Sequence, residues 1–550
     1  MYGGTIDFNS KTFSGGSISI GSSGTFNLTL ANTGSSSLSL TSPINISVQS
    51  TDTFTLPFNI TTTSTFSLGV GTLALGTYTL TTAAFSSVNG NLGTLNFGTG
   101  KIVLNGSTTR TVWNVIGINV LGGTGVTKTI GTSSGDLEAN AINFSLLETT
   151  GTVTYEFASN TIVKNLIVNG SQTISNAATN VLIYGTFTHL TTNGTTTFTA
   201  GANPWTFAAT SGSYTINHIA GFTYNFPWTF GNATSTATWT LSANLTLGAT
   251  RQLTLTNGTF DMNNKTISAA GFTIQTGTPT LANTGGSSPF TTTLPFTHTS
   301  GSFTLPFAIT TSSTSGYALT SGTLALGTYT LTTPVFSSNT ANTRTLDFGT
   351  GKIVLNGSAT ATVWNTTTVT GLTISGIPLV ECQGGGTGVT KSINSGALTE
   401  AGSISLSLLE TTGTVTYSIL GNFKNLIVNG SQTVANTNFW IYGTFTHLTT
   451  NGTTTFTAGA NAWQFSATSG NYTITPVDGF TYDFPWTFGV TASTATWSLA
   501  NNLTLGSGRQ LTLTNGTFDM NNKTISAAGF TIITGTPTLA NTGGSSPFTT

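Results

Sequence analysis

Short runs of alternating apolar and polar residues recur along the whole chain, separated by Gly or Asn-Gly. In RQLTLTNGTFDMNNKTISAAGFTI, residues 251–274, LTLT precedes Asn257 and Gly258, and a second alternating run follows. A period of two predicts strands with one buried face, and Asn-Gly predicts chain corners, because both residues accept positive φ at little cost. We find no convincing apolar pattern at the helical period of 3.6 residues. The pattern therefore predicts an all-β fold.

The same stretch shows that the chain is built from tandem repeats. Residues 251–274 return letter for letter at 509–532, and a looser version, GTIDFNSKTFSGGSISI, begins at Gly4. Terminal units of stacked arrays are often atypical because they cover an exposed edge. The predicted organisation is a divergent, cap-like start of the first repeat (1–53), its remainder (54–257), a second repeat (258–515) and the uncapped start of a third (516–550).

Two architectures fit such strands: an elongated β-solenoid similar to a parallel β-helix, and a string of β-sandwich domains. Charged residues make up only 5% of the chain and hydrophobic residues 37%. Sandwich domains usually expose a charged face, and no linkers between candidate domains are found. Short strands with tight corners and stackable Thr, Asn and Phe suit coils of about 20–25 residues. The solenoid is the favoured prediction.

The charge and the cysteine content limit the classes of partner that the chain is expected to bind. The net charge is -1, and no basic patch suits nucleic acid or anionic lipid. No apolar run approaches the length of a membrane span, and the N-terminus lacks the pattern of a signal peptide. The one cysteine, Cys382, is expected to be an unpaired thiol, with an interchain bridge as the alternative.

The few acidic residues offer little chemistry. Asp261 and Asp519 each precede a lysine by four residues in FDMNNKT, which predicts either an ion pair or an Asp that caps turn amides. Glu148 and Glu410 follow two leucines in SLLETTGTVTY. Glycoside cleavage requires two nearby carboxylates, and no second acid recurs, since Ser418 stands in the second repeat where the first has an acid. Catalysis is not expected.

Metal and cofactor sites are not expected either. His189 and His447 occupy equivalent places in GTFTHL, and no second ligand stands at a suitable spacing. The glycine-rich segments LGGTGVTK (121–128) and GGGTGVTK (384–391) do not have the spacing of a phosphate-binding loop, and no helix follows them. We interpret them as flexible corners.

Tryptophans that recur in both repeats are the basis for a hypothesis of glycan binding. Trp205 and Trp228 in the first repeat match Trp463 and Trp486 in the second. Inside a solenoid these rings would fill the core, which is the favoured interpretation. On the surface they would hold sugars, so these four residues are also the candidate glycan contacts.

Two blocks carry a resemblance to a known class: LDFGTGKIVLNGSATATVWN (346–365) and NFKNLIVNGSQTV (422–434), with counterparts at 95–114 and 164–174. They resemble the long "β-strand repeat" proteins of bacteria and tailed phages. The resemblance covers most of the chain and implies a surface or fibre component with β-helical stacking.

The function expected from the sequence is structural and non-enzymatic: the shaft or subunit of an extracellular fibre on a cell or virion surface, associating with copies of itself end to end or laterally. The alternative is a phage tail fibre or cell-surface adhesin that binds surface glycans. A minor alternative is a β-helical enzyme that degrades polysaccharide. No cofactor, nucleic-acid partner or membrane insertion is expected.

Overall fold

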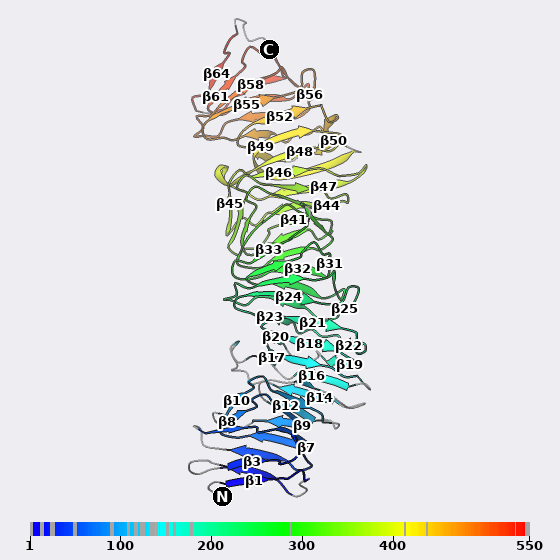
Figure 1. The fold of residues 1–550 in the computed structure, drawn as a ribbon. Coiled ribbons are helices and arrows are strands. Elements are labelled where there is room, and N and C mark those ends of the chain that lie inside the picture. The colour runs from blue at the N-terminus through cyan, green and yellow to red at the C-terminus, as the bar shows by residue number, and fades with distance from the viewer. Residues whose placement is uncertain are drawn as a thin grey trace. The chain divides into compact units, whose positions relative to one another are not determined.

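The protein is a β-solenoid in a computed structural model (Figure 1). The model describes residues 4–11, 16–21, 28–47, 52–87, 93–106, 110–114, 119–120, 127–131, 138, 141, 143–149, 153–157, 161–175, 180–286, 288–411, 414–435, 438–533 and 535–544. Within these ranges, strand pairing is parallel, and helical structure is confined to 3-10 turns such as η2 (Glu400–Gly402). Hairpin-linked sandwich strands would pair antiparallel. The solenoid prediction is confirmed.

The chain divides by its contacts into two compact units. Unit 1 comprises Met1–Ala270 with Ala282–Gly285, and unit 2 comprises Gly271–Leu281 with Gly286–Thr550. The division lies close to the predicted repeat boundary between residues 257 and 258. Parts of the predicted N-terminal cap (1–3, 12–15, 22–27 and 48–51), the corner at Asn89, the segment 121–126 and the last residues, 545–550, lie outside the described residues.

Unit 1 contains a ladder of five short strands that stack one coil above another. Its inward positions run Val181, Trp205, Trp228, Leu253, whereas Thr206, Thr229 and Thr254 face outward in register. Period-two alternation places these two sets on opposite faces, because successive side chains of a strand point to opposite sides. The strands are β17 (Thr161–Val163), β20 (Val181–Ile183), β23 (Trp205–Phe207), β26 (Trp228–Phe230) and β29 (Gln252–Leu255).

Unit 2 repeats this ladder. The inward positions run Trp463, Trp486 and Leu511, the same residue types in the same order as Trp205, Trp228 and Leu253 of unit 1. The strands are β51 (Phe439–Ile441), β54 (Trp463–Phe465), β57 (Trp486–Phe488), β60 (Gln510–Leu513) and β63 (Gly529–Ile532). The repeated sequence therefore produces repeated packing.

The stretch 251–274 contains several strands with corners between them, and the first corner lies at Asn257. Strand β29 and strand β30 (Thr259–Asp261) are separated only by the Asn257 turn, yet they do not pair with each other. Instead β29 pairs with β26, and β30 pairs with β27 (Thr238–Leu241) of the preceding coil. Gly258 has φ of 74°, as a positive-φ corner requires.

Not every Asn-Gly corner works in this way. Gly194, Gly258, Gly452 and Gly516 have positive φ, as the sequence predicted. The glycines at 106, 170, 357 and 430 do not have positive φ; a Cβ on any of them would lie 2.2–2.9 Å from a carbonyl oxygen of another coil. Their corners need Gly because two backbones approach closely.

Coil length varies more than the predicted 20–25 residues. Stacked partners lie 17 residues apart at Val415 and Gln432, and 30 apart at Ala361 and Lys391. Some strands are also longer than the pattern suggested, because they continue around a bend. The longest is β49 (Val415–Asn429), with 15 residues, which pairs with β47 (Thr390–Ser395) and β48 (Ile404–Leu408). The ladders are not perfectly regular either, because the register shifts between Thr362 and Trp364 and between Ile404 and Leu406.

Candidate functional site

The four candidate glycan-contact tryptophans lie in the interior. Trp205, Trp228, Trp463 and Trp486 are all 0% exposed. A buried indole has no face to offer a sugar, so the structure does not support the glycan hypothesis for these residues and places them in the core instead. Burial of each large side chain stabilises the fold by about 2–3 kcal/mol.

Aromatic side chains stack from coil to coil inside both units. Phe207 and Phe230 have ring centroids 4.7 Å apart, and their counterparts Phe465 and Phe488 have centroids 4.5 Å apart. A further column in unit 2 has successive centroid distances of 5.7, 6.0 and 4.9 Å, through Phe296, Tyr317, Phe336 and Trp364. Each pair adds about 0.5–1.5 kcal/mol beyond burial, so the columns join successive coils.

The two equivalent histidines are core residues. His189 and His447 are 2% exposed, and their Nδ1 atoms lie 2.9 and 2.8 Å from the hydroxyls of Tyr224 and Tyr482. Each hydroxyl also accepts a backbone N–H, which leaves its own proton for the imidazole. Burial lowers the pKa of both histidines to about 4, so they are neutral near pH 7.

Aspartate fixes the same corner in three places. The carboxylates of Asp7, Asp261 and Asp519 each accept the N–H of the residue two positions on, at 2.8–2.9 Å. Each also accepts an N–H from the next coil, at 2.8–2.9 Å, from Thr33, Thr284 and Thr542. The structure thus confirms that these aspartates cap turn amides, and it adds a link between coils that the sequence did not predict.

A buried polar cluster surrounds Glu410, which the sequence had suggested only as one half of an unmatched carboxylate pair. Lys391 and Glu410 are both 0% exposed, with Nζ 2.6 Å from Oε1. The hydroxyl of Tyr417 donates to the same carboxylate oxygen, and the N–H of Gly385 donates to Oε2 at 2.8 Å. The second glycine-rich segment is therefore part of this cluster. The burial of Lys391 could have been predicted from the alternation in TKSINS, because Lys391 lies two residues before Ile393 and so points to the same, inward face.

The first repeat contains an equivalent contact between a tyrosine and a buried glutamate. The hydroxyl of Tyr155 donates to the buried carboxylate of Glu148. Lys128 is in register with Tyr155 in the β-ladder, as Lys391 is with Tyr417. The two glutamates therefore lie in the interior, far from each other in sequence, each beside a tyrosine.

Two further polar side chains in the second repeat are fully buried. Arg344 donates to the carbonyls of Asn342, Ser338, Thr368 and Thr370, so backbone oxygens satisfy its guanidinium. Cys382 is a free, buried thiol, and burial raises its pKa to about 12. A thiol in this position is not available to a partner chain.

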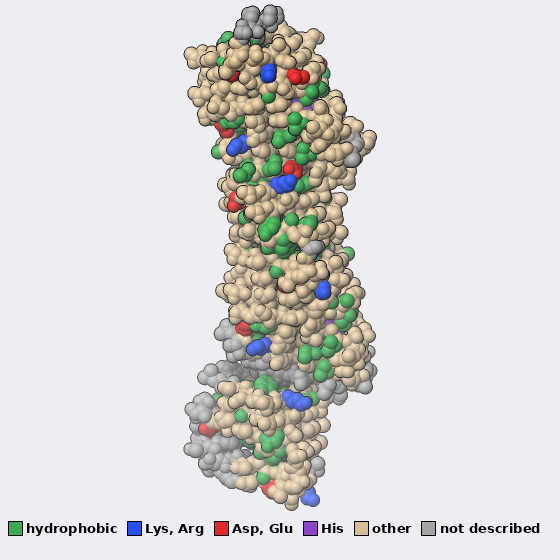
Figure 2. All heavy atoms as spheres, turned by 45° about the horizontal axis from the view of Figure 1, so that its top comes forward, with side chains coloured by type: hydrophobic (Ala, Val, Ile, Leu, Met, Phe, Trp, Pro, Cys, Tyr) green, Lys and Arg blue, Asp and Glu red, His purple; other side chains and the backbone are tan. Residues whose placement is uncertain are grey.

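Charged side chains are scattered over the face of the molecule that Figure 2 draws, among hydrophobic side chains and a majority of other atoms, which include the backbone. Single large apolar residues are exposed at Ile6, Leu190, Tyr329, Ile377, Leu420, Trp440, Leu448, Ile532, Ile533 and Leu539. Among the described residues, no group of three or more His, Cys, Asp or Glu is placed to hold a metal ion.

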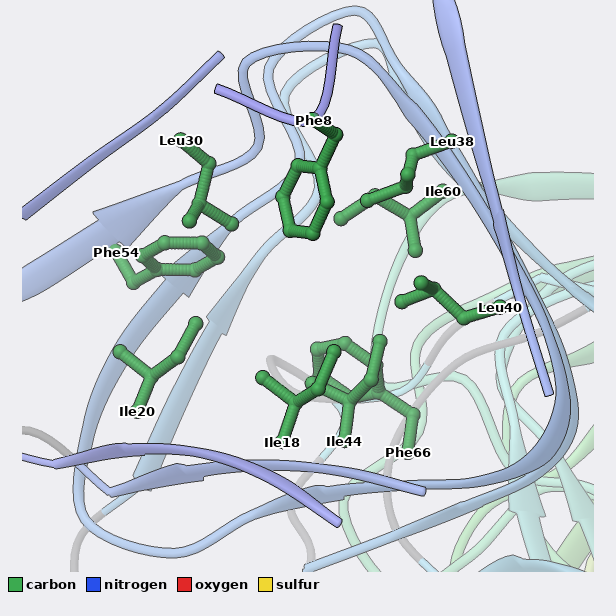
Figure 3. A pocket seen from close by; sticks show the side chains of 10 residues that line it. All are labelled: Phe8, Ile18, Ile20, Leu30, Leu38, Leu40, Ile44, Phe54, Ile60 and Phe66. Atoms are coloured by element: carbon green, nitrogen blue, oxygen red, sulfur yellow. The ribbon is translucent and has the colours of Figure 1, made fainter. Parts of the chain in front are cut away.

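An apolar pocket lies inside the first coils of unit 1. Figure 3 shows its ten side chains pointing toward one another: Phe8, Ile18, Ile20, Leu30, Leu38, Leu40, Ile44, Phe54, Ile60 and Phe66. Ligand sites usually add a few polar groups that fix orientation, and this lining has none. We interpret the pocket as loosely packed core.

No helix within the described ranges is long and apolar enough to cross a membrane. Comparison with family models, curated proteins and solved structures finds no match to this chain.

Proposed function

We propose that this chain is a non-enzymatic structural protein that forms the shaft or subunit of an extracellular fibre and associates with copies of itself. The observation that carries the proposal is the in-register stacking of strands within each unit, reinforced by interior aromatic columns. Backbone hydrogen bonds that run from coil to coil resist extension and proteolysis, because many must break together.

The surface supports association between copies. The chain has 13 basic and 14 acidic residues among 550, so neighbouring shafts repel each other little. Outward Thr ladders such as Thr206, Thr229 and Thr254 present flat rows of methyl and hydroxyl groups. Such rows suit lateral packing, since β-branched side chains on a pleated surface pack closely.

The test is negative-stain microscopy and sedimentation of the purified chain over a range of concentrations. We expect filaments or bundles that grow with concentration. Replacing Thr206 and Thr254 by Lys adds charge to one outward face and should reduce bundling, whereas the matched Thr→Ser changes should not. Single short particles at high concentration would count against the fibre role.

A second candidate function, glycan binding by an adhesin or tail fibre, rests on one exposed aromatic residue. Trp440 on β51 is 42% exposed, and its in-register neighbour is Gln464. An exposed indole beside an amide is suited to stacking on and hydrogen bonding to a sugar. A glycan array that gives hits with the wild-type chain and loses them in Trp440→Leu, the residue type at the equivalent position Leu182, would support it; an array without hits would exclude it.

A further inference from the structure

The buried contact between Lys391 and Glu410 joins two successive strands of the solenoid. Lys391 is on β47, and Glu410 follows β48 by two residues. Their side chains meet at 2.6 Å with no exposure, and Nζ also donates to the carbonyl of Gln383 at 2.8 Å. An amine and a carboxyl group are therefore held together in an interior that excludes water.

Two donors point at the carboxyl group of Glu410. The Tyr417 hydroxyl donates to Oε1 and the Gly385 N–H donates to Oε2. Burial, followed by the neighbouring Cys382 and Glu410, raises the pKa of Tyr417 far above its usual range, so this hydroxyl keeps its proton. Gly385 is required at its position because a Cβ there would lie 2.3 Å from Val415 Cγ2. Donors fixed at both oxygens are what acyl transfer needs.

We propose that Lys391 and Glu410 condense to form an intramolecular isopeptide bond between Nζ and Cδ. The ammonium group first transfers a proton to the carboxylate, which gives a neutral amine and a carboxylic acid. The amine then attacks Cδ, and Gly385 stabilises the negative charge that develops on Oε2. The bond from Cδ to Oε1 breaks, Tyr417 passes a proton to the leaving oxygen and regains one from nitrogen, and one water is released. Atoms and charge balance without any co-reactant.

The surroundings favour condensation over a lasting ion pair. Two buried charges lose their hydration, which is unfavourable, and the amide removes both charges. The pair is already in contact, which supplies the high effective concentration of an intramolecular reaction. A matched contact in the same repeat lacks these conditions: Lys352 and Glu381 also meet at 2.8 Å, but the Lys352 side chain is 38% exposed. Water competes at that pair, so it should remain ionic.

The test is the intact mass of the folded, full-length chain measured under denaturing conditions, which break ion pairs but not amides. We expect a mass lower than that of the sequence by one water, about 18 Da, for this bond. Proteolysis should yield a branched peptide that joins the segment of Lys391 to that of Glu410. The full sequence mass, or a deficit that maps elsewhere, such as to an Asn-Gly succinimide, would overturn the proposal. So would an equal cross-link between Lys352 and Glu381.

Variants separate the reaction from folding. Lys391→Met with Glu410→Gln removes both charges together, and the chain should fold without the branched peptide. Tyr417→Phe keeps the ring but loses the proton donor, so the mass change after refolding should slow by about 10–100-fold. An unchanged rate would overturn the role assigned to Tyr417. These readouts are independent of the fibre proposal, because an isolated chain gives them whether or not it assembles.

Discussion

Replacing tryptophan by phenylalanine should destabilise one buried site of unit 2 much more than another. Trp364 and Trp486 are both 0% exposed and both stack in aromatic columns. They differ at the indole nitrogen. Nε1 of Trp364 donates to the Thr366 hydroxyl at 3.0 Å, whereas Nε1 of Trp486 has no acceptor among the described residues. The same substitution therefore removes a satisfied donor at one site and an unsatisfied donor at the other.

The expected difference follows from these contacts. Loss of ring area costs about 1–2 kcal/mol of unfolding free energy at either site. At Trp364 the lost hydrogen bond adds about 1 kcal/mol. At Trp486, removal of a buried unpaired N–H raises the unfolding free energy by about 1–3 kcal/mol, which offsets the loss of ring area. We expect Trp364→Phe to cost about 2–3 kcal/mol and Trp486→Phe to be close to neutral. The ring-area cost cancels between the two sites, so the expected difference is about 2–4 kcal/mol.

Urea denaturation followed by far-UV circular dichroism measures both variants in the same unit. Trp463→Phe serves as a control, since its Nε1 also lacks an acceptor in the described part of the chain and should behave as Trp486→Phe does. The reasoning is refuted if Trp486→Phe is as destabilising as Trp364→Phe.

Three further substitutions test other contacts. Arg344→Leu leaves several carbonyls without their donor and should lower unfolding free energy by about 3 kcal/mol or more in a urea titration. Burial lowers the pKa of His447 from its ordinary value of 6.5 to about 4, so its contribution to stability is complete above pH 6.5 and is lost as pH falls toward 4. The loss is up to about 3 kcal/mol, and His447→Phe should flatten the dependence. Gly430→Ala places a Cβ 2.2 Å from the backbone carbonyl oxygen of Glu410 and should lower the melting temperature markedly.

The glycine substitution has a control in the same chain, and each of the three has an outcome that would refute it. Gly16→Ala meets nothing within 4 Å and should be neutral, so an equal loss in both glycine variants would refute the close-approach argument. Stability that stays constant between pH 6.5 and 4 in the wild type would exclude the histidine effect. An Arg344→Leu variant with wild-type stability would show that its carbonyl contacts contribute nothing.

The interior of the ladders was predictable because alternation is local. Trp205 and Trp463 lie two residues from Phe207 and Phe465, so period two alone assigns each pair to one face. The tandem copies then predict that both repeats pack alike, as they do. The role of Asp261 was predictable to the extent that an Asp close before two Asn residues is typical of a turn.

Contacts between coils were not predictable in the same way. Lys391 meets Glu410 across 19 residues, and Asp261 meets Thr284 across 23. Coil length sets which residues stack, and it varies from one coil to the next because corners absorb insertions. A pattern of period two carries no information about that length.

The sequence by itself determined that this protein is an all-β solenoid of tandem repeats with an aromatic interior, because alternation and repetition are properties of neighbouring residues. Only the tertiary structure decided which polar groups are enclosed, and why glycines such as Gly430 are required. The enclosed polar groups and the close backbone approaches depend on the register between coils, which backbone hydrogen bonding fixes only when the whole stack is assembled.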